Sequence, residues 1–219
     1  MDNDVAGYRF RDERLLQAAL THTSYLPEAA EPPIESFERL EFLGDGVVDF
    51  VVADDLFRKF PDAAEGELTE RRAQVVSRVA LARVGDQLGL MERARLGKGV
   101  GVNEPRYGFT TRLFESVVGA VYIDGGFEAA RSFVRSTLGP LLEQPLRRSP
   151  KGELQELTQD RFGAMPEYVK LESADVDQPP RFVYEARIAG KAATGAGRSM
   201  KAAQEQAAAR LLEELKRDE

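Results

Sequence analysis

The sequence contains no cysteine and a single histidine, His22. Without cysteine the chain cannot form disulfides, thiolate-ligated zinc sites or a thiol nucleophile. One histidine is too few for a metal site built from several imidazole ligands. Any metal site must therefore be built from oxygen ligands, which favours Mg²⁺, Mn²⁺ or Ca²⁺.

Long apolar runs are also missing. No uninterrupted apolar stretch reaches the roughly 18 residues that a membrane-spanning helix needs, so no membrane association is expected. The polar, acidic N-terminus (MDNDVAGYRFRDER) does not resemble a secretory signal. Together with the absence of cysteine, this predicts a cytoplasmic protein.

The charge balance is acidic, with a formal net charge of −7 over 219 residues. A negative net charge argues against nucleic acid as a partner. Phosphate binding needs only a local basic patch, however, so the distribution of Lys and Arg decides the question. The apolar content of 42% supports a hydrophobic core, and the length suits one large or two small domains.

The most informative segment is 37–48, which reads FERLEFLGDGVV. In a helix, the side chains of Glu38, Glu41 and Asp45 share an arc of about 60°, and aliphatic residues occupy the opposite face. Like charges this close repel one another, so a cation is expected among them. In a functional interpretation the cation is a divalent metal ion. In a structural one, the carboxylates form an ordinary solvated face beside an arginine or open water.

Helical patterns fill the chain to about residue 146. Ser36 is a suitable N-cap for the acidic helix, and Pro61 ends that helix. The segment 111–124 is apolar almost all round after Glu115, which is typical of a central helix. We therefore expect an all-α N-terminal domain over residues 1–146, with helices at 12–22, 37–59, 65–88, 111–124 and 127–138.

The pattern changes after a proline-containing linker that ends at Pro150. Residues 166–173 and 181–188 alternate like strands, and 191–197 can form a third. A helix precedes these strands, and Ser199 is placed to cap a final alanine-rich helix. The order α-β-β-β-α predicts a small α+β domain over residues 150–219.

Both parts of the chain resemble one known family. The core of segment 37–48, ERLEFLGD, is similar to the ribonuclease III signature, and THTSY at 21–25 is similar to its upstream element. EGELT at 65–69 and the helix at 114–124 match further elements of that family. Residues 150–216 resemble a double-stranded RNA-binding domain through PKGELQELTQ, PEY and GRSMKAAQEQAAARLL.

The resemblance implies an endoribonuclease that cleaves double-stranded RNA with divalent metal, as a homodimer with two active sites. Phosphodiester hydrolysis needs an activated water and neutralised charge, and carboxylate-bound Mg²⁺ provides both. By resemblance, Glu41, Asp45 and Glu115 hold the Mg²⁺, for which Mn²⁺ is a possible substitute. Asp45 and Glu115 are also assigned as catalytic, together with Glu38 and Glu65 at further acidic positions. Glu65 is placed to reach the site of a partner subunit.

The chain departs from the family at Arg112. The family has an aspartate there, as a fourth metal ligand, so the local formal charge changes from −4 (four acids) to −2 (three acids and one base). The guanidinium faces the same way as Glu115 and can pair bidentately with Glu115 or Glu41. Two hypotheses follow: an active ribonuclease III with an altered site, or a catalytically impaired relative that binds double-stranded RNA.

The small domain is expected to read duplex RNA by its shape. Its first helix, an inter-strand loop and the start of its last helix supply the positions that match the family's RNA contacts: Gln155, Glu156, Gln178, Arg198, Ser199 and Lys201. The alternative for Lys201 is an ordinary solvated lysine, and Met200 stands where the family usually has a second lysine. We therefore expect modest binding through a small patch.

His22 lies at the end of the first predicted helix, where a structural role in capping carbonyl groups is favoured over catalysis. Taken together, the sequence and its resemblance predict a cytoplasmic, dimeric, Mg²⁺-dependent endoribonuclease. It would be specific for double-stranded RNA and would process structured precursors such as rRNA and mRNA.

Overall fold

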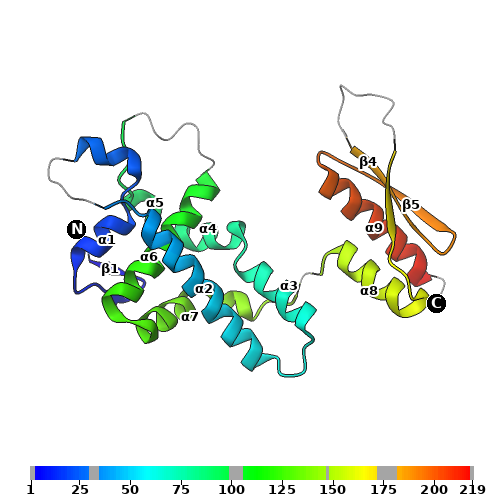
Figure 1. Cartoon of the computed structure of the whole chain (residues 1–219), viewed down its shortest axis with the longest axis horizontal. Coiled ribbons are helices and arrows are strands. Elements are labelled where there is room, and N and C mark those ends of the chain that lie inside the picture. Colours follow the sequence, from blue (N-terminus) through cyan, green and yellow to red (C-terminus); the bar gives the residue numbers. More distant parts are fainter. Residues whose placement is uncertain (1–2, 30–34, 99–105, 147, 172–181, 218–219) are drawn as a thin grey trace. The chain divides into compact units, whose positions relative to one another are not determined.

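The chain divides into two compact units, residues 1–146 and 147–219, in the computed structural model (Figure 1). The structure describes residues 3–29, 35–98, 106–146, 148–171 and 182–217. Within these residues no helix combines the length and the apolar character needed to cross a membrane.

The N-terminal unit is a set of helices packed around one central helix, α6, which contacts α1, α2, α4, α5 and α7. The short hairpin of β1 and β2 is a small departure from the all-α prediction. The elements are β1 (Asp4–Val5), β2 (Tyr8–Arg9), α1 (Glu13–Ala19), the 3-10 helix η1 (Thr23–Glu28), α2 (Glu38–Lys59), α3 (Glu65–Val75), α4 (Arg78–Gln87), α5 (Leu90–Arg93), α6 (Arg106–Gly125) and α7 (Phe127–Leu142).

The central position of α6 follows from its apolar sequence. Leu113, Phe114, Val117, Val118 and Val121 are fully buried in the core of this unit. A helix that is apolar on every side is stable only when neighbours cover all of it. The prediction of a central helix over 111–124 is therefore confirmed, although α6 begins earlier, at Arg106.

Helices α2 and α6 cross in direct backbone contact at two glycines. A Cβ at Gly44 would lie 1.8 Å from the carbonyl oxygen of Glu115, and a Cβ at Gly119 would lie 2.1 Å from that of Leu40. Any side chain at either position would force the helices apart, because real atoms do not approach so closely. The crossing therefore fixes the acidic segment of α2 against the middle of α6.

The predicted start of α2 is wrong. The N-cap is Phe37 rather than Ser36, so the helix begins at Glu38, and no side chain caps its first turn. Phe37 precedes it with a fully buried ring, and the Phe37 N–H donates to the Thr21 carbonyl oxygen at 3.0 Å. Burial of the ring and this backbone bond set the helix start, so the capping propensity of Ser36 does not decide it.

The single helix predicted over 65–88 is also wrong, because it is two helices. Helix α3 ends at Val75 and α4 begins at Arg78. The Ser77 hydroxyl accepts a hydrogen bond from the Ala80 N–H at 3.3 Å and so caps α4. A serine can satisfy helix-start N–H groups in this way, which makes a break at this point inexpensive.

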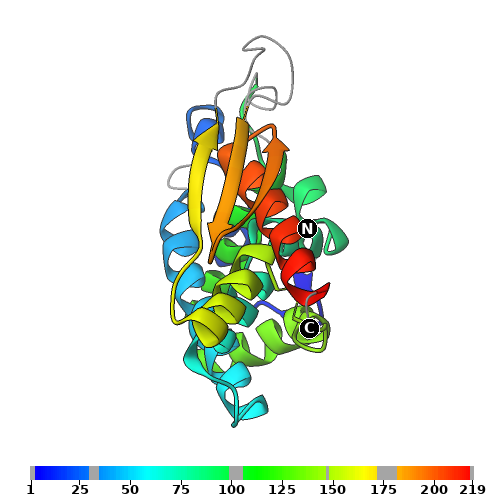
Figure 2. The ribbon, with the colours of Figure 1, turned by 90° about the vertical axis from the view of Figure 1, so that its right-hand side faces the viewer.

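The C-terminal unit contains an antiparallel sheet in the order β3-β4-β5 (Figure 2). Helix α9 contacts β4 and β5, and α8 contacts α9. A Cβ at Gly195 would lie 2.1 Å from the Ala207 nitrogen, so glycine on β5 and alanine on α9 allow a close approach. This arrangement confirms the predicted order α-β-β-β-α. The elements are α8 (Pro150–Phe162), β3 (Glu167–Leu171), β4 (Phe182–Ile188), β5 (Lys191–Gly197) and α9 (Met200–Arg217).

The crossing of α2 and α6 can be tested by adding one methyl group. Gly44→Ala should lower the free energy of unfolding by about 2 kcal/mol or more, because the methyl group meets backbone that cannot move aside. Gly46→Ala is the matched control, since a Cβ there meets nothing within 4 Å. It should raise stability by up to about 1 kcal/mol, as Ala is the better helix former. Urea unfolding of both variants measures the difference, and equal stabilities would contradict the assignment.

Candidate active site and RNA-binding surface

The crossing gathers carboxylates from two helices. Glu41 and Asp45 flank Gly44 on α2, and the Glu115 carbonyl oxygen faces Gly44 from α6. Asp45 is exposed, whereas Glu41 and Glu115 are partly buried. Glu38 lies one turn before Glu41 and is exposed. The acidic stripe predicted on α2 is therefore one wall of a site whose other wall is α6.

Arg112 lies on α6, and its side chain reaches the carboxylates of α2. Its Nε donates to both carboxylate oxygens of Glu41, at 3.0 and 2.9 Å. Its Nη2 lies 3.8 Å from a carboxylate oxygen of Glu38. Of the two partners left open by the sequence, the structure thus pairs Arg112 with Glu41 rather than with Glu115. The Arg112 and Glu41 side chains are only 29% and 24% exposed, so solvent screens this ion pair incompletely.

An aromatic stack supports the guanidinium. The Cζ of Arg112 lies 4.6 Å from the centroid of the buried Phe37 ring, a cation–π distance. The Phe37 ring stacks on His22 at 5.6 Å and meets Phe109 edge-on at 5.8 Å. Because His22 and Phe109 hold the Phe37 ring in position, the ring provides a fixed surface against which Arg112 packs. Sequence reasoning missed this role of Phe37, although its place directly before the first acidic residue was a signal.

His22 is structural, but not in the predicted way. Its Nδ1 accepts a hydrogen bond from the Ser24 N–H at 3.1 Å, so it caps the start of η1 rather than the end of α1. The Ser24 hydroxyl in turn accepts from the Gly97 N–H at 3.0 Å. The THTSY segment therefore supports the stack beneath Arg112 and also holds the chain at Gly97.

Glu115 is the most perturbed of these carboxyl groups. Burial raises its pKa from 4.5 to about 7, with smaller contributions in the same direction from the Asp45 and Glu41 carboxylates. The guanidinium groups of Arg78 and Arg112 act in the opposite direction and do not cancel this rise. An uncompensated carboxylate that is partly buried favours either a proton or a further cation. Arg78 is the second basic group near Glu115 and was not singled out from the sequence.

The predicted metal ligands fit a divalent ion only in part. Among the residues that the structure describes, no group of three or more His, Cys, Asp or Glu side chains is arranged to hold a metal ion. Glu41 already gives both oxygens to Arg112. Asp45 and Glu115 remain, and Mg²⁺ is commonly held by one or two carboxylates with water and substrate phosphate completing its shell. These two residues fit such an ion by donor type and by unneutralised charge.

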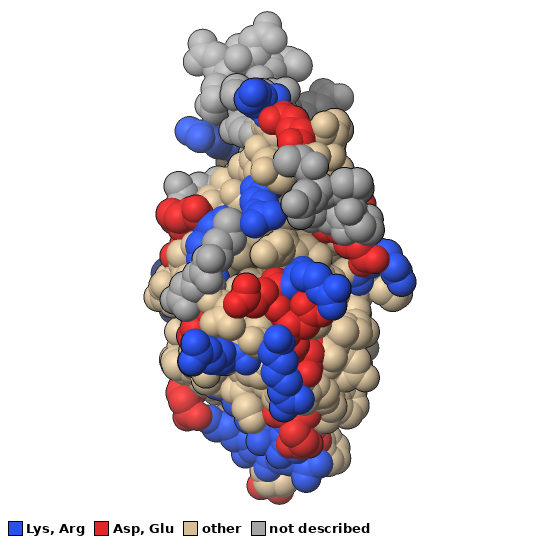
Figure 3. All heavy atoms as spheres, turned by 90° about the vertical axis from the view of Figure 1, so that its left-hand side faces the viewer, with Lys and Arg blue, Asp and Glu red and all other residues tan. Residues whose placement is uncertain are grey.

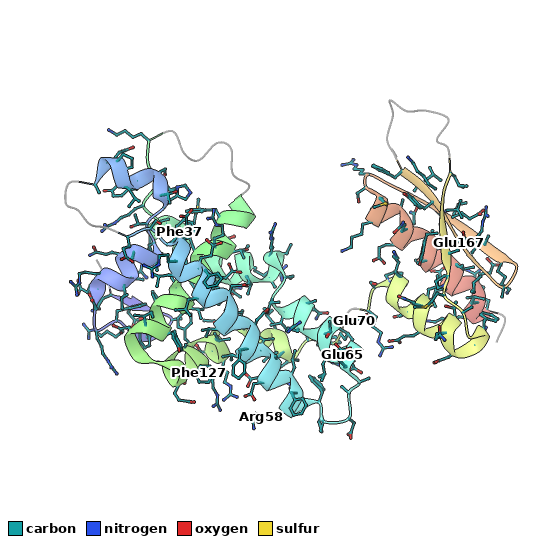
Figure 4. The ribbon with its side chains drawn as sticks, in the orientation of Figure 1. Phe37, Arg58, Glu65, Glu70, Phe127 and Glu167 are labelled. Carbon is teal, nitrogen blue, oxygen red and sulfur yellow. The ribbon has the colours of Figure 1, made fainter. Side chains whose placement is uncertain are left out.

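Glu65 does not join this cluster within one chain. It is exposed at the start of α3 and accepts a hydrogen bond from the Thr69 hydroxyl at 2.8 Å. Figure 4 shows it well away from Phe37, beside the opposite end of α2. A hollow there is lined by Glu65, Phe50 and Phe57 among others. Any role of Glu65 at the carboxylate cluster would have to involve a second subunit.

Helix α2 exposes three phenylalanines. Phe42, Phe50 and Phe57 are 84%, 60% and 71% exposed. Their spacing of eight and seven residues puts them on one face of the helix. Phe42 adjoins a hollow of about 600 Å³ that is also lined by Leu43 and Ile123. An exposed apolar face of this kind marks an interaction site.

The predicted RNA contacts of the second unit lie at its surface. Gln155 and Glu156 are exposed on α8, and Arg198, Ser199 and Lys201 are exposed at the start of α9. The two helices are joined by a hydrogen bond from Lys151 Nζ to Gln204 Oε1, at 2.9 Å. The Ser199 hydroxyl accepts from the Ala202 N–H at 3.2 Å, which confirms the predicted cap of α9. Gln178 lies outside the described residues.

Positive charge is interspersed with negative charge on one face of the molecule. On the face of the molecule shown in Figure 3, Lys and Arg lie among Asp and Glu. With a net charge of −7, broad electrostatic attraction to RNA would be weak. Binding must therefore depend on local contacts, such as an exposed arginine or lysine at a helix N-terminus.

The raised pKa of Glu115 predicts a pH-dependent stability in metal-free buffer. Folding raises this pKa from 4.5 to about 7, so the folded state binds the proton more tightly than the unfolded state does. Its contribution to the free energy of unfolding therefore falls as pH rises through that interval. Glu115→Gln removes this loss, so the variant should gain stability relative to the parent between about pH 5 and about pH 8.

Urea unfolding at both pH values in the presence of a chelator measures this gain. Glu13→Gln, at an exposed glutamate of α1, reports the general effect of removing one carboxyl group. A Glu115→Gln difference that is the same at both pH values would contradict the prediction.

Comparisons with known proteins agree with this arrangement. Residues 12–141 match the family described as Ribonuclease-III-like, and residues 150–215 match the double-stranded RNA binding motif. Ribonuclease 3 of Symbiobacterium thermophilum is 42% identical over 218 residues, which cover 95% of this chain and 91% of that protein. Ribonuclease 3 of Bdellovibrio bacteriovorus is 38% identical over 217 residues, covering 94% and 92%.

Solved structures give the same assignment for the first unit. The nuclease domain of ribonuclease III from Campylobacter jejuni is 32% identical, with a TM-score of 0.56, and the match covers 64% of this chain and 92% of that one. A second structure of that domain is 31% identical, with a TM-score of 0.54 and coverage of 61% and 94%. It is described as flexible in a region involved in dimer formation. This chain belongs to the ribonuclease III family, with a nuclease region followed by a double-stranded RNA-binding motif.

Proposed function

We propose that this protein is an endoribonuclease that hydrolyses double-stranded RNA with the help of a divalent metal ion, at a site built on Asp45 and Glu115. The observation that carries the proposal is the convergence of these two carboxylates, from helices locked together at Gly44 and Gly119. The nuclease domain would span residues 1–146 and the RNA-binding domain residues 150–219. Family membership supports this reaction class.

The metal ion would be Mg²⁺, with Mn²⁺ as a substitute. Members of the family generally depend on divalent metal, and the site offers only oxygen donors. When bound, the ion would supply charge neutralisation at the phosphate and an activated water. Asp45 and Glu115 would hold it, while Glu41 and Glu38 lie beside Arg112. The fixed crossing of α2 and α6 would keep the two ligands in register.

The second unit would hold the duplex. Duplex RNA is recognised through minor-groove hydroxyls and flanking phosphates, which requires donors on a rigid surface. Arg198 and Lys201 would contact phosphate at the N-terminus of α9, with Ser199 at its cap. Gln155 and Glu156 would contact the minor groove from α8, and Gln178 is proposed from the sequence alone.

A homodimer would complete the catalytic assembly. In a two-fold dimer each copy presents both partners of a contact, so Phe42 of one copy can enter the hollow beside Phe42 of the other. The exposed phenylalanines of α2 would then be covered. Glu65, which lies apart from the cluster within its own chain, would approach the site of the second copy. The dimer-forming region described for the Campylobacter jejuni nuclease domain supports this proposal.

The natural substrates would be structured precursors such as rRNA and mRNA, handled in the cytoplasm. The alternative, a relative with impaired cleavage that only binds duplex RNA, has no support from the comparisons. Relatives that match over most of the chain are named as ribonucleases. The presence of Arg112 is therefore compatible with nuclease activity.

Cleavage of a long RNA duplex with Mg²⁺ tests the function. The parent should cut the duplex and leave a single strand of the same sequence intact. Asp45→Asn and Glu115→Gln should each lower the rate by about a hundredfold or more, because the metal provides several kcal/mol of transition-state stabilisation. Asp49→Asn, one turn further along α2, is the matched control and should cut normally. If Asp45→Asn and Glu115→Gln both cut the duplex as fast as the parent, the proposed site is excluded.

Sedimentation of Phe42 variants tests the dimer. Phe42→Asp should convert the dimer to a monomer at micromolar concentration, because a carboxylate would be buried at the centre of the contact. Val79→Asp makes the same change at another exposed apolar side chain, on α4, and should remain dimeric. A dimeric Phe42→Asp protein would show that this face of α2 is not the interface.

A further inference from the structure

Arg112 is held on two sides, which distinguishes it from a surface arginine. On one side its Nε donates to both oxygens of Glu41, at 3.0 and 2.9 Å. On the other side Phe37 lies 4.6 Å from its Cζ and is itself completely buried. Charge-assisted bonds to a carboxylate and a cation–π contact act together on one planar group. The guanidinium therefore has a defined place within the site.

The position of the Arg112 guanidinium determines which carboxylates can bind a metal ion. Glu41 faces the guanidinium with both of its oxygens, so a metal ion could use Glu41 only by breaking that pair. Asp45 is exposed and Glu115 is partly buried, and the Arg112 Nε donates to Glu41 rather than to either of them. Two carboxylates are enough for Mg²⁺, which keeps several water molecules and takes further oxygens from phosphate.

We propose that Arg112 is a positioning residue that acts as a resident cation of the site. It holds Glu41 as its own counter-ion and so leaves the divalent ion to Asp45 and Glu115. This inference rests on the proposed metal-dependent function and refines it. A basic residue at this position also reduces the negative charge that an ion would otherwise have to neutralise. Part of the site's positive charge is thus supplied by the chain itself.

The proposal predicts that removing the guanidinium strengthens metal binding. Mn²⁺ affinity is measured by isothermal titration calorimetry on the full-length protein without RNA. Arg112→Met keeps much of the side-chain volume over Phe37 and frees Glu41. Freeing Glu41 offers the ion a third carboxylate ligand, so Mn²⁺ binding should tighten by about tenfold. Arg83→Met removes the same charge from an exposed position on α4 and should change the affinity by less than about twofold.

A second background separates the hold on Glu41 from simple charge. In Glu41→Gln protein no carboxylate can be released, so Arg112→Met should produce a gain several times smaller than in the parent. A gain of equal size in both backgrounds would overturn the proposal, because Arg112 would then act by charge alone. The proposal would also be overturned if Arg112→Met changed the Mn²⁺ affinity no more than Arg83→Met does. It would equally be overturned if Mn²⁺ bound to neither the parent nor Arg112→Met.

Two measures keep the result interpretable. Circular dichroism establishes that each variant is folded, and Arg112→Gln replaces Arg112→Met in the same comparisons if the latter does not fold. RNA cleavage by the parent is measured separately. If Mn²⁺ binding changes as expected but the parent does not cleave RNA, the proposed function is rejected and the role of Arg112 is retained. If the parent cleaves RNA but Arg112→Met has the parent's Mn²⁺ affinity, the role of Arg112 is rejected and the function is retained.

Discussion

The contact between α2 and α6 at Gly44 and Gly119 is the constraint on which the site depends. It lets two helix backbones touch, so residues next to Gly44 face residues next to Glu115 at close range. Burial of α6 supplies the driving force, since its apolar face is covered on every side. Carboxylates that repel one another are thereby held together by packing elsewhere in the domain. The fold thus maintains a charge arrangement that the charges alone would disperse.

That arrangement also explains the two arginines near Glu115. Crowded carboxylates in a partly buried place require positive charge, and Arg112 and Arg78 supply some of it. Arg112 donates to both oxygens of Glu41, however, and burial keeps the pKa of Glu115 raised. The same unsatisfied charge that destabilises ionised Glu115 is what would draw a metal ion to it. Electrostatic strain and proposed cofactor binding are two consequences of one geometry.

Much of this could be predicted from the sequence. The signature motif indicated the acidic wall on α2, the apolar run predicted a central α6, and alternating patterns predicted the second domain. The partner of Arg112 could not be predicted, because the choice between Glu41 and Glu115 depends on how the helices cross. Phe42 and Phe37 are equally apolar in sequence, yet one is exposed and the other buried. A hydrophobic pattern does not distinguish a core residue from one exposed at the surface.

If Arg112 keeps Glu41 as its partner, the metal ion is left to Asp45 and Glu115. The most direct test is a crystal structure of the protein soaked with Mn²⁺, with the ion located by its anomalous scattering. Mn²⁺ should be bound by Asp45 and Glu115, with the Arg112 guanidinium still paired with Glu41. Mn²⁺ coordinated by Glu41, with Arg112 turned away from it, would contradict this role of Arg112.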